Sequence, residues 1–216
     1  MRGTQSSGYG ISQVWDAPNT FLPGGNLSAP LLNSLNPGEA KELLDIMDRL
    51  EEVRAARKGK TDFLQFVSMM WPAFIKGSHH KIMAEAFEKI VHGPSDRVII
   101  NLAPRHSKSE LASYLLPAWF LGNYPDKKVI QTAHTAELAV GFGRKVRNLV
   151  GSEEFKRVFP DVNLRADSKA AGRWNTNHGG EYFAIGVGGA VTGKGADLFI
   201  IDDPHSEQDA QVGDPA

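Results

Sequence analysis

Residues 97–109, RVIINLAPRHSKS, decide the fold of this chain. The run 97–103 is mostly apolar and is typical of a buried parallel strand. A polar loop follows, and the pattern then predicts a helix from Ser109 to about Leu121, kinked or shortened by Pro117. A strand, a loop and a helix in this order can bind a phosphate group, because the helix N-terminus presents free backbone N–H groups.

The rest of the chain alternates strands with helices in the same way. The expected strands are residues 128–133, 174–176, 181–187 and 196–203. The expected helices run from Ser78, as its cap, to Gly93 and from about Ala136 to Gly151. This alternation favours an α/β fold, with a mainly parallel sheet between helices on both faces, which is a three-layer sandwich.

The N-terminal part of the chain has a different character. Residues 1–35 are rich in Gly, Ser, Asn and Pro, so we expect a flexible arm without a core of its own. Residues 36–60 are predicted to form an amphipathic helix, which should pack on something. Asn36 is its expected N-cap, with Glu39 completing a capping box. Residues 61–216 are then one α/β domain.

Composition excludes several classes of protein. The 216 residues carry 24 Lys and Arg against 25 Asp and Glu, so any nucleic-acid contact must come from local patches. The chain has no cysteine, which excludes a disulfide framework and thiolate sites. It also lacks an apolar run long enough for a membrane span and an N-terminal apolar segment, so we expect a protein that is not secreted.

Two stretches compete as a phosphate-binding loop. Residues 188–195, GGAVTGKG, fit the usual pattern better and lack only the final hydroxyl residue, yet they lead into a strand. Residues 102–109, LAPRHSKS, have Leu102 and Ser107 where glycines are expected, but a strand precedes them and a helix follows. We favour 102–109 for this context; the alternative is a basic surface loop with an ordinary serine N-cap.

A pair of acids supplies the second part of the pattern. Asp202 ends the apolar run 198–202, where an acid can bind the magnesium ion of a phosphate loop. Asp203 follows, in position to orient or deprotonate an attacking water. The alternative is that residues 202–204 are a turn, since Asp-Pro is a strong turn signal. The loop and the acids together favour nucleotide hydrolysis.

Three segments resemble the ATPase domain of large terminase subunits, the DNA-packaging motors of tailed bacteriophages. They are residues 103–110 (APRHSKSE), 192–197 (TGKGAD) and 199–205 (FIIDDPH). The resemblance covers about residues 62–209. It implies a P-loop NTPase fold of the additional-strand, RecA-like type and hydrolysis of ATP with Mg²⁺.

The resemblance also implies partners and a place of action. In that family, identical subunits form a ring, expected to be a pentamer, that drives double-stranded DNA through the portal protein with help from the small terminase subunit. The expected location is the host cell cytoplasm, transiently at the portal of the procapsid.

Site residues follow from the resemblance, residue by residue. Lys108 would contact the β- and γ-phosphates, Ser109 and Asp202 would bind magnesium, and Asp203 would take the place of the usual catalytic glutamate. Arg105 would act on the γ-phosphate. The full set of expected nucleotide contacts is Pro104, Arg105, His106, Ser107, Lys108, Ser109 and His80.

The chain departs from the family pattern in three ways. Ser107 replaces the glycine before the lysine, which matters if that position needs a positive φ. Asp203 is one methylene shorter than glutamate. Family members also carry a coupling motif on a later strand and a C-terminal nuclease domain, so we expect a fragment of a protein that is also an endonuclease. A nucleotide-binding assembly module without turnover and a helicase-like DNA translocase remain as alternatives.

Overall fold

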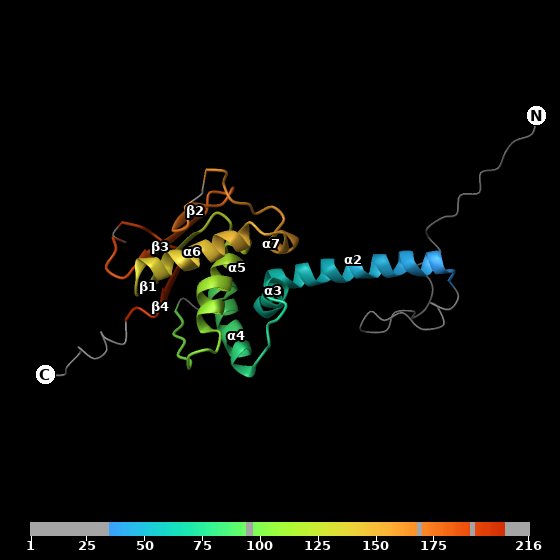
Figure 1. Ribbon diagram of the computed structural model, residues 1–216, viewed down its shortest axis with the longest axis horizontal. Coiled ribbons are helices and arrows are strands. Elements are labelled where there is room, and N and C mark those ends of the chain that lie inside the picture. The colour runs from blue at the N-terminus through green and yellow to red at the C-terminus, as the bar shows by residue number, and fades with distance from the viewer. Residues whose placement is uncertain (1–34, 94–96, 168–169, 191–192, 206–216) are drawn as a thin grey trace, which may run out of the picture. The chain divides into compact units, whose positions relative to one another are not determined.

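The computed structural model describes residues 35–93, 97–167, 170–190 and 193–205 (Figure 1). The predicted arm, residues 1–35, lies outside this part of the chain except for its last residue. The chain forms two compact units, residues 1–52 and residues 53–216.

Helix α2 (Pro37–Thr61) confirms the helix predicted at residues 36–60. Its N-terminus has the predicted capping box: the Asn36 Oδ1 accepts from the backbone N–H of Glu39 at 3.0 Å, and the Asn36 N–H donates to Glu39 Oε2 at 3.0 Å. The packing of this helix differs from the prediction. The apolar side chains of Leu44 and Leu50 are about half exposed, at 50% and 49%. Among the described residues, the first turns of α2 therefore bury no apolar stripe.

The second unit contains a four-stranded sheet with the strand order β2-β3-β1-β4. The strands are β1 (Lys128–Ala133), β2 (Arg173–Asn175), β3 (Glu181–Gly186) and β4 (Leu198–Asp202). Strand β1 runs parallel to both β3 and β4, and β2 pairs with β3 antiparallel. This confirms an α/β fold with a mostly parallel sheet, and all four of these strands lie where the sequence predicts them.

Helices complete the unit (Figure 1). They are α3 (Phe63–Met70), α4 (Ser78–His92), the π-helix η2 (Glu110–Leu115), α5 (Leu116–Asn123), α6 (Ala136–Val150) and α7 (Glu153–Val158). The sequence predicts α4, α5 and α6 but not the short α3 and α7. The N-cap of α4 is Gly77 and not Ser78, because His80 reaches back to accept a hydrogen bond from the Gly77 N–H.

The core lies between one face of the sheet and the helices. Trp174, on the edge strand β2, donates from Nε1 to the Gly143 carbonyl of α6 at 3.2 Å. Trp119 of α5 is fully buried and donates from Nε1 to the Gly59 carbonyl at 2.8 Å, which ties the end of α2 to this core. On the opposite face of the sheet, Phe199 and Ile201 are 50% and 57% exposed. The third layer that the sequence predicts is therefore not seen over these two residues.

Residues 97–103 correct one prediction. We expected a buried strand, but this segment is not part of the sheet, and Ile99 is 89% exposed. Residues 98–101 and residues 198–204 line the same cavity, of about 420 Å³. A strand needs a partner within about 4.8 Å. Apolar composition predicts burial, but it does not predict that partner.

Among the residues that the structure describes, no helix combines the length and the apolar composition needed to cross a membrane.

Candidate functional site

The segment 104–107 turns directly into a helix. The Ser107 carbonyl accepts from the Leu111 N–H at 3.0 Å, so helical hydrogen bonding begins here. Lys108 and Ser109 lie in the first turn, whose backbone N–H groups have no carbonyl partner within the helix. The free N–H groups and the helix dipole favour an anion in front of this turn.

Two residues of this loop have left-handed backbone conformations. Arg105 has φ 64° and Ser107 has φ 60°. Such values are uncommon outside glycine, because Cβ meets the neighbouring backbone. The position before Lys108, where the family pattern has glycine, therefore does take a positive φ, and this chain places a serine there.

The loop encloses a cavity of about 660 Å³. Its lining residues are Leu102, Ala103, Pro104, Arg105, Ser107, Lys108, Ser109, Glu110 and Asp203. The volume is in the range of small-molecule sites. Most of the predicted nucleotide contacts line this one space, together with the acid from the end of β4.

The strand end and the helix start meet at Asp202. Its carboxylate is 6% exposed. The Ser109 Oγ donates to Asp202 Oδ1 at 3.2 Å, and the Ser113 Oγ donates to Asp202 Oδ2 at 2.8 Å. The structure thus brings together Ser109 and Asp202, which are 93 positions apart in the sequence.

These oxygens suit a hard cation. A serine hydroxyl and a carboxylate are ligands that Mg²⁺ accepts, and Mg²⁺ usually keeps several waters and phosphate oxygens as its other ligands. In the described part of the chain, no group of three or more His, Cys, Asp or Glu side chains is placed to hold a metal ion. Ser109 and Asp202 fit an ion that also depends on a phosphate-bearing ligand.

Lys108 and Asp203 form an ion pair at the mouth of the cavity. The Lys108 Nζ lies 2.5 Å from Asp203 Oδ1. The Asp203 side chain is 65% exposed and that of Lys108 is 25% exposed. Asp203 also has a left-handed backbone, with φ 41°. The lysine expected at the phosphates and the acid expected at the water are therefore paired with each other.

His80 and His106 do not line the cavity. His80 is 5% exposed, its Nδ1 accepts from the Gly77 N–H at 2.9 Å, and its ring lies 3.8 Å from that of His79 between ring centroids. Burial, together with the neighbouring His79, lowers the pKa of His80. His106 donates from Nδ1 to the Pro104 carbonyl at 2.9 Å, which braces the loop from within. His106 thus supports the loop, and His80 supports the start of α4.

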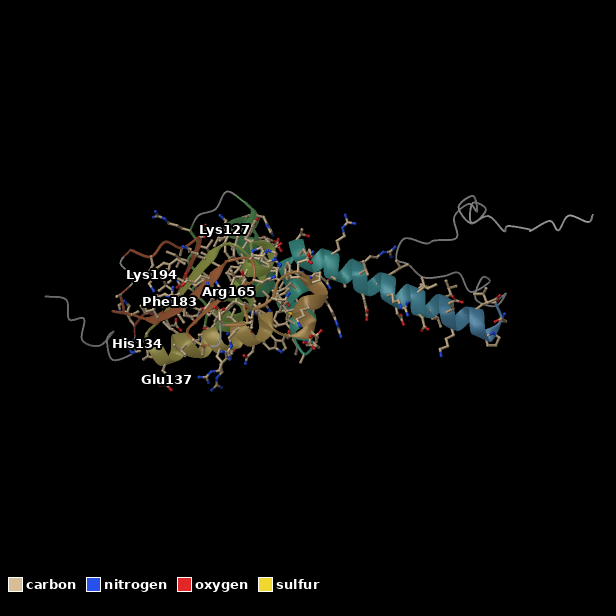
Figure 2. All side chains as sticks on the ribbon, turned by 90° about the horizontal axis from the view of Figure 1, so that it is seen from above. Lys127, His134, Glu137, Arg165, Phe183 and Lys194 are labelled. Atoms are coloured by element: carbon tan, nitrogen blue, oxygen red, sulfur yellow. The ribbon has the colours of Figure 1, made fainter. Side chains whose placement is uncertain are left out.

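The competing glycine-rich stretch is arranged differently. It includes residues 191–192, which lie outside the described residues, and it leads into β4. The Lys194 Nζ lies over the ring of Phe183, 3.3 Å from its centroid (Figure 2). This lysine contacts an aromatic ring of the sheet. It does not line the cavity that holds Lys108 and Asp203.

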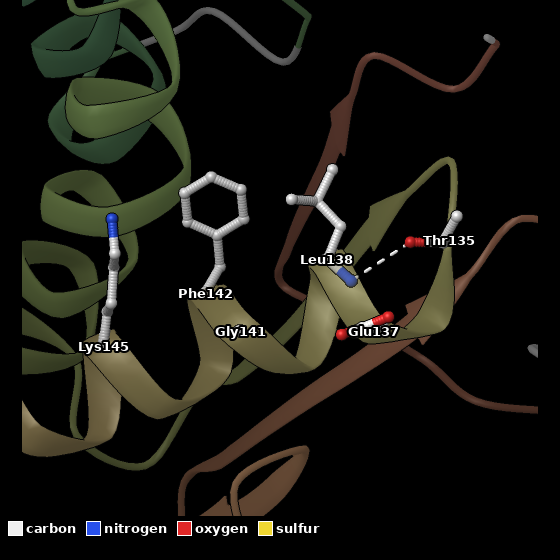
Figure 3. Close-up of a pocket in the computed structure, with 6 residues that line it drawn as sticks. All are labelled: Thr135, Glu137, Leu138, Gly141, Phe142 and Lys145. Atoms are coloured by element: carbon white, nitrogen blue, oxygen red, sulfur yellow. Dashed lines mark hydrogen bonds between the residues drawn. The ribbon is translucent and has the colours of Figure 1, made fainter.

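A second cavity, of about 480 Å³, lies along α6 (Figure 3). Leu138 and Phe142 line it, and Thr135 caps the helix by accepting from the Leu138 N–H at 3.2 Å. The Lys145 Nζ is paired with Glu110 Oε1 at 2.8 Å. None of Lys108, Ser109, Asp202 and Asp203 lines this cavity.

Sequence reasoning missed Ser113. The signal was available, because Ser113 follows Ser109 by four positions and such residues share a face of a helix.

Comparisons with protein-family models, with curated proteins and with solved structures give no match for this chain.

Proposed function

We propose that this chain is a magnesium-dependent ATPase, the motor domain of a large terminase subunit that packages double-stranded DNA into a phage procapsid. The observation that carries the proposal is the meeting of Lys108 and Ser109, at a helix N-terminus, with Asp202 and Asp203, at the end of a parallel strand. A lysine, a serine hydroxyl and two acids that lie together can serve phosphoryl transfer to water.

Each residue has a separate task in this proposal. Lys108 leaves Asp203 and binds the β- and γ-phosphates, while the backbone N–H groups of its turn hold the phosphate oxygens. Ser109 and Asp202 hold Mg²⁺, which neutralises charge on the phosphates. Asp203, freed from Lys108, accepts a proton from the attacking water. Arg105 lines the same cavity and offers its guanidinium to the γ-phosphate.

The remaining parts of the proposal concern the assembly. A homo-oligomeric ring, a pentamer, would act at the portal protein with the small terminase subunit, in the host cytoplasm. ATP turnover should then rise when the ring assembles on portal and DNA.

The test is ATP hydrolysis measured as phosphate release, with and without Mg²⁺. We expect Lys108→Ala to abolish turnover and to weaken ATP binding, and Asp203→Asn to keep binding while turnover is lost. Lys81→Ala, which removes an exposed lysine of α4, is the matched control and should behave like the unmodified chain. Undiminished hydrolysis in both site variants would refute the proposal.

One observation favours a second candidate, a nucleotide-binding assembly module without turnover. Asp203, the residue expected to act as the base, is paired with Lys108, and its side chain is shorter than that of glutamate. This candidate predicts that ATP with Mg²⁺ raises the melting temperature, while no phosphate is released even with DNA and portal present.

A further inference from the structure

Ser113 lies on a stretch of helix with unusual geometry. Residues Glu110–Leu115 form the π-helix η2, and the Leu116 N–H bonds to the Leu111 carbonyl, five residues back. Short π-helical segments inside α-helices are rare and occur frequently at functional sites.

Pro117 gives this segment a physical cause. In an α-helix, a proline lacks the N–H that would bond to the carbonyl four residues back, and its ring clashes with that carbonyl. For Pro117 that carbonyl belongs to Ser113. The wide turn of η2 ends just before Pro117, which is buried at the start of α5. The helix thus continues past the proline because it widens ahead of it.

The widened turn brings a second hydroxyl to the acid. Ser113 is fully buried, and its Oγ donates to Asp202 Oδ2 at 2.8 Å. A buried helical serine commonly bonds to the carbonyl of its own preceding turn. Here it bonds across to β4, while Ser109 donates to the other oxygen, Oδ1, at 3.2 Å. One helix face therefore holds both oxygens of one nearly buried carboxylate.

We infer that Ser113 is a positioning residue of the metal site: it fixes Asp202 Oδ2 so that Oδ1 faces Ser109 and the cation between the helix and β4. This inference rests on the proposed function. Without the Ser113 hydroxyl, the carboxylate can rotate about its last bond, and Oδ2 lies buried without its donor. The loss falls on Mg²⁺ and not on the phosphate contacts of Lys108.

The experiment measures ATP binding by calorimetry over a series of Mg²⁺ concentrations. A hydrogen bond to a charged group is strong enough that Ser113→Ala should raise the half-saturating Mg²⁺ concentration by about ten- to a hundredfold. Affinity for ATP in EDTA should be unchanged. Ser113→Thr keeps the hydroxyl and should restore most of the Mg²⁺ response.

The matched control is Ser68→Ala. Its hydroxyl bonds only within its own helix, to the Leu64 carbonyl at 2.8 Å, so the half-saturating Mg²⁺ concentration should not move. A lower melting temperature of Ser113→Ala with an unchanged Mg²⁺ response would assign Ser113 a purely structural role and overturn the inference. Equal shifts in Ser113→Ala and Ser113→Thr would also overturn it. An unmodified protein that binds no ATP overturns the proposed function, and the inference with it.

Discussion

Replacing Ser107 by glycine tests the conformation of the loop. Ser107 has φ 60°, a left-handed value that an L-residue adopts at a cost of about 1–2 kcal/mol. Glycine avoids this cost but loses about 0.5–1 kcal/mol more chain entropy on folding. The difference of the midpoints leaves Ser107→Gly more stable by about 0.75 kcal/mol, within a range of about 0–1.5 kcal/mol. For a chain of this size, the midpoint value corresponds to a melting temperature higher by about 1–4 °C.

The assay is unfolding in urea, followed by circular dichroism, with the unfolding free energy taken from the linear extrapolation. Ser107→Ala is the matched control, because alanine loses the hydroxyl but keeps the Cβ and therefore the strain. We expect Ser107→Gly to have the highest unfolding free energy. The unfolding free energy of Ser107→Ala should be equal to that of the unmodified chain or lower. If the glycine variant is no more stable than the alanine variant, the left-handed conformation is not the source of strain and the reasoning fails.

Three further predictions concern other parts of the unit. Asp203→Asn should raise the affinity for ATP up to about fivefold in low salt, because it releases Lys108 from a solvent-screened pair worth at most about 1 kcal/mol. His80→Asn should reduce the loss of unfolding free energy at acid pH. Burial lowers the pKa of His80 below its ordinary 6.5, so the unfolded chain binds more protons than the folded chain, and the unfolding free energy falls as the pH drops below 6.5. Gly122→Ala should destabilise by about 1–3 kcal/mol in urea unfolding, because a Cβ there overlaps the ring of Phe159.

Each of these has its own control. The gain in ATP affinity should vanish when Asp203→Asn is combined with Lys108→Ala, and a gain that persists would contradict the explanation. A pH profile of the unfolding free energy that is unchanged in His80→Asn would show that another group titrates. Gly141→Ala is the comparison for Gly122→Ala, since a Cβ at Gly141 meets nothing within 4 Å, and it should stabilise its helix or leave it unchanged.

Sequence alone predicted the pairing of Ser109 with Asp202. An apolar run that ends in an acid and a hydroxyl at a helix start are local patterns, and ligands bind at the carboxyl ends of the strands of a parallel sheet. The prediction of a strand at residues 97–103 was wrong, because hydrogen bonding to a neighbouring strand depends on where that strand lies and not on the apolar run itself. The exposure of Phe199 and Ile201 has a similar reason, since their pattern indicates an apolar face but not what covers it.

The finer geometry depends on contacts that no short pattern contains. The hydrogen bond that His80 accepts from Gly77 and the burial of its ring are contacts of this kind. Ser113 lies in the π-helix η2, which ends just before Pro117. A proline in a helix predicts a disturbance, and the sequence indicated that much, but the direction in which the chain yields depends on the packing of η2 against β4.

The unpaired outer edge of β4 has a mechanical consequence. Within the described residues, β4 is hydrogen-bonded on one side only, to β1, and Asp202 is its last residue. An edge strand is restrained by one ladder of bonds where an interior strand has two. A displacement of β4 along or away from β1 therefore moves the Ser109 hydroxyl through its hydrogen bond to the carboxylate of Asp202, with no other element between them.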